Sequence, residues 1–228
     1  MFLSQAPLAG SILAIEQRPD GSPQRLRSNG RRRRPTGLYF SVKSGRHLPY
    51  ESRAELHDLW RSEVRTDVVR SWPQPFSMRF MLDGELRRYT PDRKDLLVDG
   101  SVEIVEVKGA SGLMDADYIA KLECVTGLLS AQGLPFKISD AAEIEAEPRF
   151  SAIAEIQRHR RTRLTPNDVV KAKDSLANGP SPLGVVQGLF GGGPIGIATV
   201  SALMVRRVVD VDIRGGLHEG AAVKLAAE

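Results

Sequence analysis

Apolar and polar residues alternate along the chain with two different periods. Residues 50–69 place apolar side chains three and four positions apart, which predicts an amphipathic helix. Prolines at positions 73 and 75 are expected to end it. Beyond them the spacing changes to the shorter period that is typical of strands. The pattern therefore predicts a helix followed by a β-rich region.

Two segments of the form strand, turn, strand follow one another in this region. Residues 76–82 and 85–89 flank an Asp-Gly pair at 83–84, which predicts a β-hairpin. Residues 96–98 and 102–107 flank a second Asp-Gly pair at 99–100. The valine and isoleucine content of the last of these strands suits a buried central strand.

A helix over residues 118–132 and a strand over residues 135–139 are predicted next. The order of a helix, antiparallel strands, a helix and a strand is typical of an α/β or α+β core. We assign this core to residues 35–148.

A change in composition near Pro148 marks a second module, residues 149–228. Residues 151–163 are predicted to form a basic helix, and Thr165-Pro166 has the form of an N-cap followed by a first-turn proline. Three helices separated by glycine and proline, over residues 169–208, and a strand-like end follow. This order suits a small, mainly helical, winged-helix-like domain, and an unrelated small bundle is the alternative.

The net charge of +4 is concentrated at the start of the chain. Residues 1–34 hold seven arginines against two acidic residues, and the rest of the chain is almost neutral. We interpret this segment as a flexible basic arm, with Arg31, Arg32, Arg33 and Arg34 as candidate DNA-binding residues, because neutralised phosphates release counterions. A solvated tail is the other interpretation. The cluster of basic residues at 158–163 is open to the same two interpretations.

Other features exclude several classes of protein. No apolar run reaches the roughly 18 residues that span a bilayer, and the opening segment lacks the pattern of a signal peptide, so we expect a cytoplasmic protein and no membrane partner. The single cysteine, Cys124, argues against zinc and redox chemistry. The glycine-rich residues 191–196 lack the ending of a phosphate-binding loop, and the four histidines are scattered.

Three residues form the most informative constellation. Glu106 and Lys108 lie two apart on a predicted strand and therefore share one face. The antiparallel strand that precedes them can place Asp92 beside this pair. Two carboxylates and an ammonium suit phosphodiester hydrolysis, in which Mg²⁺ needs hard oxygen ligands and a cation orients the attacking water. Mn²⁺ can replace Mg²⁺ in such a site.

A further carboxylate comes from the predicted helix. Glu55 lies at the edge of its apolar stripe, where a carboxylate needs a partner. A metal ion would provide one, and an ion pair with Arg53 or Arg87 would provide another.

Several separate motifs, in one order from residue 35 to about 144, resemble the TnsA-type endonuclease subunits of heteromeric transposases. They are residues 36–46 (TGLYFSVKSGR), 51–55 (ESRAE), 68–76 (VVRSWPQPF), 88–92 (RYTPD) and 105–108 (VEVK). The resemblance implies a restriction-endonuclease-like PD-(D/E)xK fold. It also implies that Glu55, Asp92, Glu106 and Lys108 form the active site and that Val107 offers its main-chain carbonyl to the metal.

The resemblance further implies partners. Such subunits cut the 5′ (non-transferred) strand of double-stranded DNA at transposon ends, in the bacterial cytoplasm. They work with an integrase-like transposase and an AAA+ ATPase regulator, which their winged-helix-like C-terminal half engages. A stand-alone restriction or repair nuclease and a non-catalytic adaptor are the alternative functions.

The chain departs from the family pattern after Asp92, where Arg93-Lys94-Asp95 precede the apolar run. Asp95 is therefore an alternative metal ligand, although the spacing to the turn favours Asp92. Glu51 competes with Glu55 in the same way, and its position in the motif favours Glu55.

Overall fold

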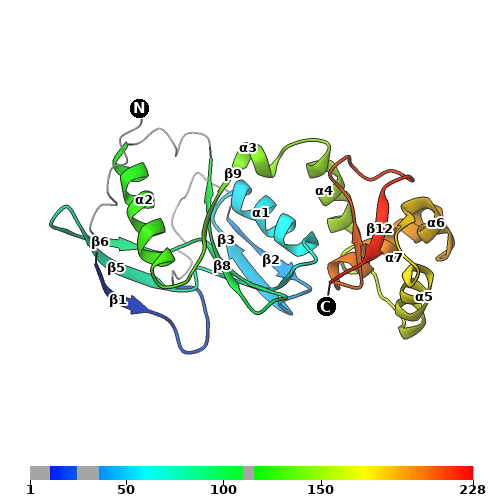
Figure 1. Cartoon of the computed structure of the whole chain (residues 1–228), viewed down its shortest axis with the longest axis horizontal. Coiled ribbons are helices and arrows are strands. Elements are labelled where there is room, and N and C mark those ends of the chain that lie inside the picture. Colours follow the sequence, from blue (N-terminus) through cyan, green and yellow to red (C-terminus); the bar gives the residue numbers. More distant parts are fainter. Residues whose placement is uncertain (1–10, 25–35, 110–115, 228) are drawn as a thin grey trace.

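The computed structural model describes residues 11–24, 36–109 and 116–227. Over these residues the chain is a mixed α/β protein with several sheets and helices. Figure 1 shows an elongated molecule, in which the sheets of the N-terminal half lie at one end and helices α5, α6 and α7 at the other. None of the helices in the described ranges has the length and apolar character needed to cross a membrane.

The first helix is shorter than the sequence pattern predicts. Helix α1 spans Arg53–Val64, with the Ser52 side chain as its N-cap. Its C-cap residue Arg65 is extended (ψ 116°), and strand β4 follows at Val68–Pro73. The prediction of a helix to residue 69 is wrong at this end because residues 68–73 pair with a neighbouring strand. Strand pairing outweighs the helical spacing there.

The four-stranded sheet has the order β4-β7-β8-β9. Its remaining strands are β7 (Arg93–Leu97), β8 (Val102–Lys108) and β9 (Phe136–Asp140). β4 and β7 are antiparallel, as are β7 and β8, whereas β8 and β9 are parallel. A parallel pair needs a crossover, and helix α2 (Ala116–Ser130) lies in that connection. The predicted buried strand over residues 102–107 is confirmed.

Helices α1 and α2 cover opposite faces of β8. Successive side chains of a strand point to opposite faces. Val105 and Val107 pack with Ala54 of α1, whereas Ile104 belongs to the apolar cluster that holds the buried residues of α2. Glu106 is two residues from Ile104 and therefore belongs to the face that α2 covers.

A second sheet has the order β1-β5-β6. The hairpin of β5 (Ser77–Leu82) and β6 (Glu85–Tyr89) confirms the prediction around the Asp-Gly turn at 83–84, where both residues have positive φ. Strand β1 (Ile12–Glu16) pairs antiparallel with β5. Residues 12–16 were predicted to be part of a flexible arm, and this is wrong because β5 offers them an open sheet edge. Residues 25–34 lie outside the described ranges.

A hairpin that the sequence analysis did not predict lies against α1. Strands β2 (Gly37–Ser41) and β3 (Arg46–Tyr50) pair antiparallel. Tyr39, Leu48 and Leu59 form a small apolar cluster between this hairpin and the helix. The hairpin therefore extends the packing of α1 beyond the main sheet.

Four buried charged side chains join α1 to β7. Asp58, Arg61, Arg93 and Asp95 are each at most 4% exposed. Arg93 donates to both Asp58 and Asp95, with 2.9 Å between Nε and Oδ1 of Asp95. Arg61 donates to Asp58 over 2.6 Å. The two positive and two negative charges balance, and the pKa of the Arg93 guanidinium is raised because these carboxylates outweigh its burial.

The C-terminal half consists of short helices and a small antiparallel sheet. After the one-turn helix α3 (Ala141–Ile144), it has the order of α4 (Arg149–His159), α5 (Pro166–Leu176), β10 (Ser181–Pro182), α6 (Leu183–Gly188), α7 (Gly193–Val205), β11 (Val209–Val211) and β12 (Ala222–Leu225). The sheet has the order β10-β12-β11. Thr165 and Asp168 form a capping box at α5, as the N-cap pattern predicts.

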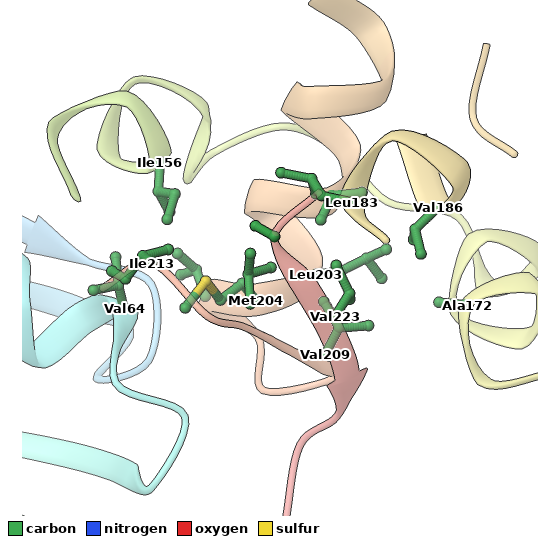
Figure 2. Packing of buried hydrophobic residues seen from close by; sticks show 14 of the residues in the cluster. Val64, Ile156, Ala172, Leu183, Val186, Leu203, Met204, Val209, Ile213 and Val223 are labelled. Atoms are coloured by element: carbon green, nitrogen blue, oxygen red, sulfur yellow. The ribbon is translucent and has the colours of Figure 1, made fainter. Parts of the chain in front are cut away.

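The two halves share one apolar core. Val64, at the end of α1, is 1% exposed and belongs to the same cluster as the buried residues of α4 and α7. Figure 2 shows Val64 pointing into this cluster beside Ile213. Polar contacts support the packing: Tyr39 donates to Gln157 over 2.8 Å, and the Arg207 side chain donates to the carbonyl of Thr66 over 2.9 Å. Helix α1 is thus held from both sides.

The buried charges make Arg93 essential for stability. Arg93→Ala leaves Asp58 and Asp95 buried without their shared partner, so we expect the free energy of unfolding to fall by about 3–5 kcal/mol. Urea denaturation followed by circular dichroism measures this. Arg158→Ala, which removes an exposed ion pair with Glu155, is the control and should leave the midpoint nearly unchanged. Equal stability of the two variants would contradict the structural role of Arg93.

Close packing of α6 on α7 makes a second prediction. A Cβ at Gly196 would lie 2.5 Å from the main-chain oxygen of Gln187. Gly196→Ala should therefore destabilise the protein by about 1–3 kcal/mol. Gly188→Ala is the matched control, because no atom lies within 4 Å of a Cβ at that helical glycine. Thermal denaturation followed by circular dichroism measures both variants, and Gly188→Ala should be neutral or slightly stabilising. Equal melting temperatures for the two variants would contradict close packing of α6 on α7.

Candidate active site

Asp92 lies between β6 and β7, directly before the first residue of β7. Its Oδ2 accepts a hydrogen bond of 2.8 Å from the main-chain N–H of Val107 on β8. Its main-chain oxygen accepts a second bond of 2.8 Å, from the N–H of Gln74. The pairing of Arg93 with Val105 continues the same ladder. The antiparallel strands therefore bring Asp92 beside β8, as its place before the turn predicts.

Glu106 and Lys108 contact one another on β8. The Lys108 Nζ lies 2.6 Å from Oε1 of Glu106, and both side chains are largely buried, at 18% and 5% exposed. Val107, between them, donates its N–H to Asp92. The structure thus brings Asp92, Glu106 and Lys108 to one place, from two neighbouring strands.

Two tyrosines complete the surroundings of Glu106. The Tyr89 hydroxyl, from β6, donates to Oε2 of Glu106 over 2.7 Å. The Tyr118 hydroxyl, from the first turn of α2, donates to Oε1 over 2.7 Å. The Lys108 ammonium also lies over the Tyr118 ring, 4.3 Å from its centroid. Sequence reasoning missed both tyrosines as site residues, although Tyr89 belongs to the same four-residue string as Asp92.

Glu55 is held at the start of α1 by its own helix. Its Oε1 accepts from the Ser52 hydroxyl over 3.0 Å, and its Oε2 accepts from the N–H of Glu51 over 2.7 Å. Ser52 in turn accepts from the N–H of Glu55 and so caps the helix. Arg87, one ion-pair partner considered for Glu55, contacts Glu85 and Asp117 instead. Glu55 therefore has a structural role whether or not it has a catalytic one.

The electrostatics tie Glu55 to the strand residues. Burial raises the pKa of the Glu55 carboxyl, and the charges of Glu51 and Glu106 raise it further, against the hydrogen bonds from the Glu51 main chain and the Ser52 hydroxyl. Burial also raises the pKa of Asp92 well above its usual range, and the charges of Glu106 and Glu55 add to this effect. The Val107 N–H and Lys108 oppose it only in part. Asp92 is therefore a partly buried carboxyl that lacks sufficient positive charge.

The described residues contain no group of three or more His, Cys, Asp and Glu side chains arranged to hold a metal ion. The carboxylates influence one another's ionisation, but each has its own hydrogen-bond donors. The oxygen ligands that this place could offer a metal ion are thus the two carboxylates of Asp92 and Glu106 and the main chain of Val107.

The two alternative carboxylates occupy different positions. Asp95 is fully buried and accepts from Arg93 and from the Ser71 hydroxyl, at 2.7 Å. It belongs to the network that joins α1 to β7. Glu51 contributes its main-chain N–H to Glu55. The structure therefore gives Asp95 compensating partners that Asp92 lacks.

Other features singled out in the sequence lie away from this place. Arg31, Arg32, Arg33 and Arg34 are outside the described residues. In the basic cluster at 158–163, Arg160 and Arg161 stack over Tyr39 and Phe40, each 5.1 Å from the ring centroid. That cluster therefore packs in part against β2 of the N-terminal half. The glycines at 191–193 form the turn that leads into α7.

Comparison with known proteins does not extend this description. No protein-family model matches the chain, and no curated protein resembles it significantly in sequence.

The uncompensated charge of Asp92 predicts a gain in stability for Asp92→Asn. Asparagine can still accept from the Val107 N–H but carries no charge. The folded-state pKa of Asp92 is raised, so its stabilising effect is complete below about pH 4 and is lost as the pH rises through that folded pKa. Without metal, Asp92→Asn should be more stable than wild type at pH 7, on the order of 1 kcal/mol.

Denaturant unfolding in EDTA at a series of pH values measures this difference. The gain should shrink toward zero near pH 4, where the wild-type carboxyl is protonated. Asp99→Asn, at an exposed turn, is the control and should bring no gain. A loss of stability at neutral pH in Asp92→Asn would show that the carboxylate is well compensated.

Proposed function

We propose that the chain is a metal-dependent DNA endonuclease with an active site of the PD-(D/E)xK type. The observation that carries the proposal is the convergence of Asp92, Glu106 and Lys108 around the main chain of Val107. Phosphodiester hydrolysis needs hard oxygen ligands and a cation beside the attacked phosphorus. These three side chains supply both.

The donor set fits a hard divalent cation, Mg²⁺ or Mn²⁺. Asp92 lies partly buried beside two further carboxylates, which raises its pKa, and a divalent cation would offset this repulsion. Asp92 and Glu106 would hold the ion with the main-chain carbonyl of Val107, and Glu55 would add negative charge from α1. When bound, such an ion polarises the phosphate and lowers the pKa of a water molecule.

The protein's own groups have distinct tasks in this mechanism. The Lys108 ammonium is held between Glu106 and the Tyr118 ring, where it can orient the attacking water and stabilise charge that develops on the phosphate. Tyr89 of β6 is 4% exposed, and its hydroxyl orients the Glu106 carboxylate. Asp95, with its own cation in Arg93, is a poorer ligand than Asp92.

The architecture supports a more specific proposal. A helix, antiparallel strands and a parallel pair joined by α2 suit a restriction-endonuclease-like core. Three helices with the sheet order β10-β12-β11 suit a winged-helix-like C-terminal domain. Together with the motifs resembling TnsA-type subunits, they support a role in the bacterial cytoplasm in cutting the 5′ strand at transposon ends. Its partners there would be an integrase-like transposase and an AAA+ ATPase, and the arginines at 31–34 would bind the DNA backbone.

The test is strand cleavage of double-stranded DNA that carries the transposon ends, with Mg²⁺ and the partner proteins present. Asp92→Ala and Lys108→Ala should each lose 5′-strand cleavage by at least about 100-fold, because each removes a group that acts in the transition state. Both variants should remain folded and bind their partners. Asp99→Asn, an exposed carboxylate near the same sheet, is the control and should cut like wild type.

The outcomes separate the possible functions. Undiminished cutting by either site variant would remove that residue from the mechanism. Robust cutting by the purified chain alone would indicate a stand-alone nuclease. Absence of cutting by the wild-type protein, with all partners and Mg²⁺ or Mn²⁺ present, would indicate a non-catalytic adaptor.

A further inference from the structure

Glu106 already receives three hydrogen-bond donors. Its Oε1 accepts from Tyr118 at 2.7 Å and from Lys108 at 2.6 Å, and its Oε2 accepts from Tyr89 at 2.7 Å. A carboxylate oxygen has two lone-pair positions, so both positions on Oε1 are taken. Oε2 keeps one open position beside Tyr89, so a metal ion can reach that oxygen, but bidentate binding by Glu106 also needs a lone pair on Oε1. The ion must therefore displace a donor before Oε1 can act as a ligand.

The two tyrosines differ in how easily they can leave. Tyr89 is 4% exposed, and its ring packs edge-on against Phe136, with 6.1 Å between the centroids. Tyr118 is half-buried and lies in the first turn of α2, between exposed Asp117 and exposed Ile119. The buried residues of α2 begin only at Leu122. Tyr118 packs only against the edge of the apolar cluster and is less buried than Tyr89, so moving it disturbs the core less than moving Tyr89 would.

Lys108 differs from both tyrosines because the proposed mechanism needs its ammonium to orient the attacking water. Its ammonium lies against the Tyr118 ring as well as against Glu106. Loss of the Tyr118 hydroxyl alone therefore leaves the ring beneath the ammonium and frees one position on Oε1. The hydroxyl and the ring of Tyr118 have separable effects.

We propose that Tyr118 is a positioning residue whose hydroxyl competes with the divalent metal for Oε1 of Glu106. The inference rests on the proposed function, because it takes Glu106 to be a metal ligand. While the hydroxyl is bonded, Glu106 has lower affinity for the metal. A partner or a DNA duplex that moves the first turn of α2 away from β8 raises that affinity. The metal site is in this way coupled to the position of α2.

The experiment is a calorimetric titration of Mn²⁺ into the full chain, without DNA or partners. Tyr118→Phe removes the hydroxyl and keeps the ring. Since a hydrogen bond to a charged group is stronger than a neutral one, the variant should bind Mn²⁺ about tenfold more tightly than wild type. Tyr39→Phe is the matched control, because that hydroxyl bonds Gln157 of α4, and it should leave the affinity unchanged.

Two further variants test whether the heat of Mn²⁺ binding comes from the site at Glu106. Glu106→Gln should abolish it, which identifies the site. Tyr89→Phe removes the donor to Oε2 and leaves both positions on Oε1 occupied, so it should not reproduce the gain of Tyr118→Phe.

The results distinguish failure of the inference from failure of the proposed function. Equal or weaker Mn²⁺ binding by Tyr118→Phe, with binding by wild type that Glu106→Gln abolishes, overturns the role of Tyr118 alone. Absence of Mn²⁺ binding in both wild type and Tyr118→Phe, or binding that Glu106→Gln leaves intact, overturns the metal site itself and the inference with it.

Discussion

The hydrogen bond from the Val107 N–H to Asp92 is the contact on which the candidate active site depends. It joins the segment before β7 to the C-terminal end of β8 and so sets Asp92 beside both Glu106 and Lys108. The ladder between the strands fixes which residues face one another. A slip of one residue would send Glu106 and Lys108 to the opposite face of the sheet.

Two aspartates three positions apart show how the environment divides structural from chemical roles. Asp95 is fully buried but has Arg93 and Ser71 as donors, so its charge is balanced within the protein. Asp92 is partly buried and has a main-chain donor and two carboxylate neighbours. A buried charge that its surroundings do not balance is unfavourable in the absence of a ligand. This contrast favours Asp92 as the residue that needs a cation. Arg93, in contrast, stabilises the fold.

The site is assembled by several layers of structure. Helix α1 contributes Glu55 and is held by the buried charges on one side and by the C-terminal half through Val64 on the other. Helix α2 contributes Tyr118 from the opposite face of the sheet. Because Asp117 and Ile119 of the first turn of α2 are exposed and the buried residues of the helix begin only at Leu122, this is the part of the site that can change most easily.

Sequence patterns alone were sufficient for the elements whose stability is local. The two Asp-Gly turns, the central strand, α2 and the helices of the C-terminal half follow from turn chemistry, apolar spacing and capping residues. The grouping of Asp92, Glu106 and Lys108 followed from the same turn. Three elements did not follow. Strand β1 and the hairpin of β2 and β3 depend on edges and faces offered by distant segments, and α1 ends early because residues 68–73 pair with β7.

The distinction extends to the site. Residues two apart on a strand share one face, and a turn of known type sets which residues of the two strands lie opposite. Both rules act over a few residues, so the sequence determines which carboxylates can meet. Several partners of those carboxylates come from other helices and strands of the fold. Tyr118 reaches Glu106 from the helix of the crossover between β8 and β9, and Asp95 accepts from Ser71 of β4 as well as from Arg93 of its own strand. Only the tertiary structure could decide which charges are balanced, because burial and long-range contacts set the ionisation of each group.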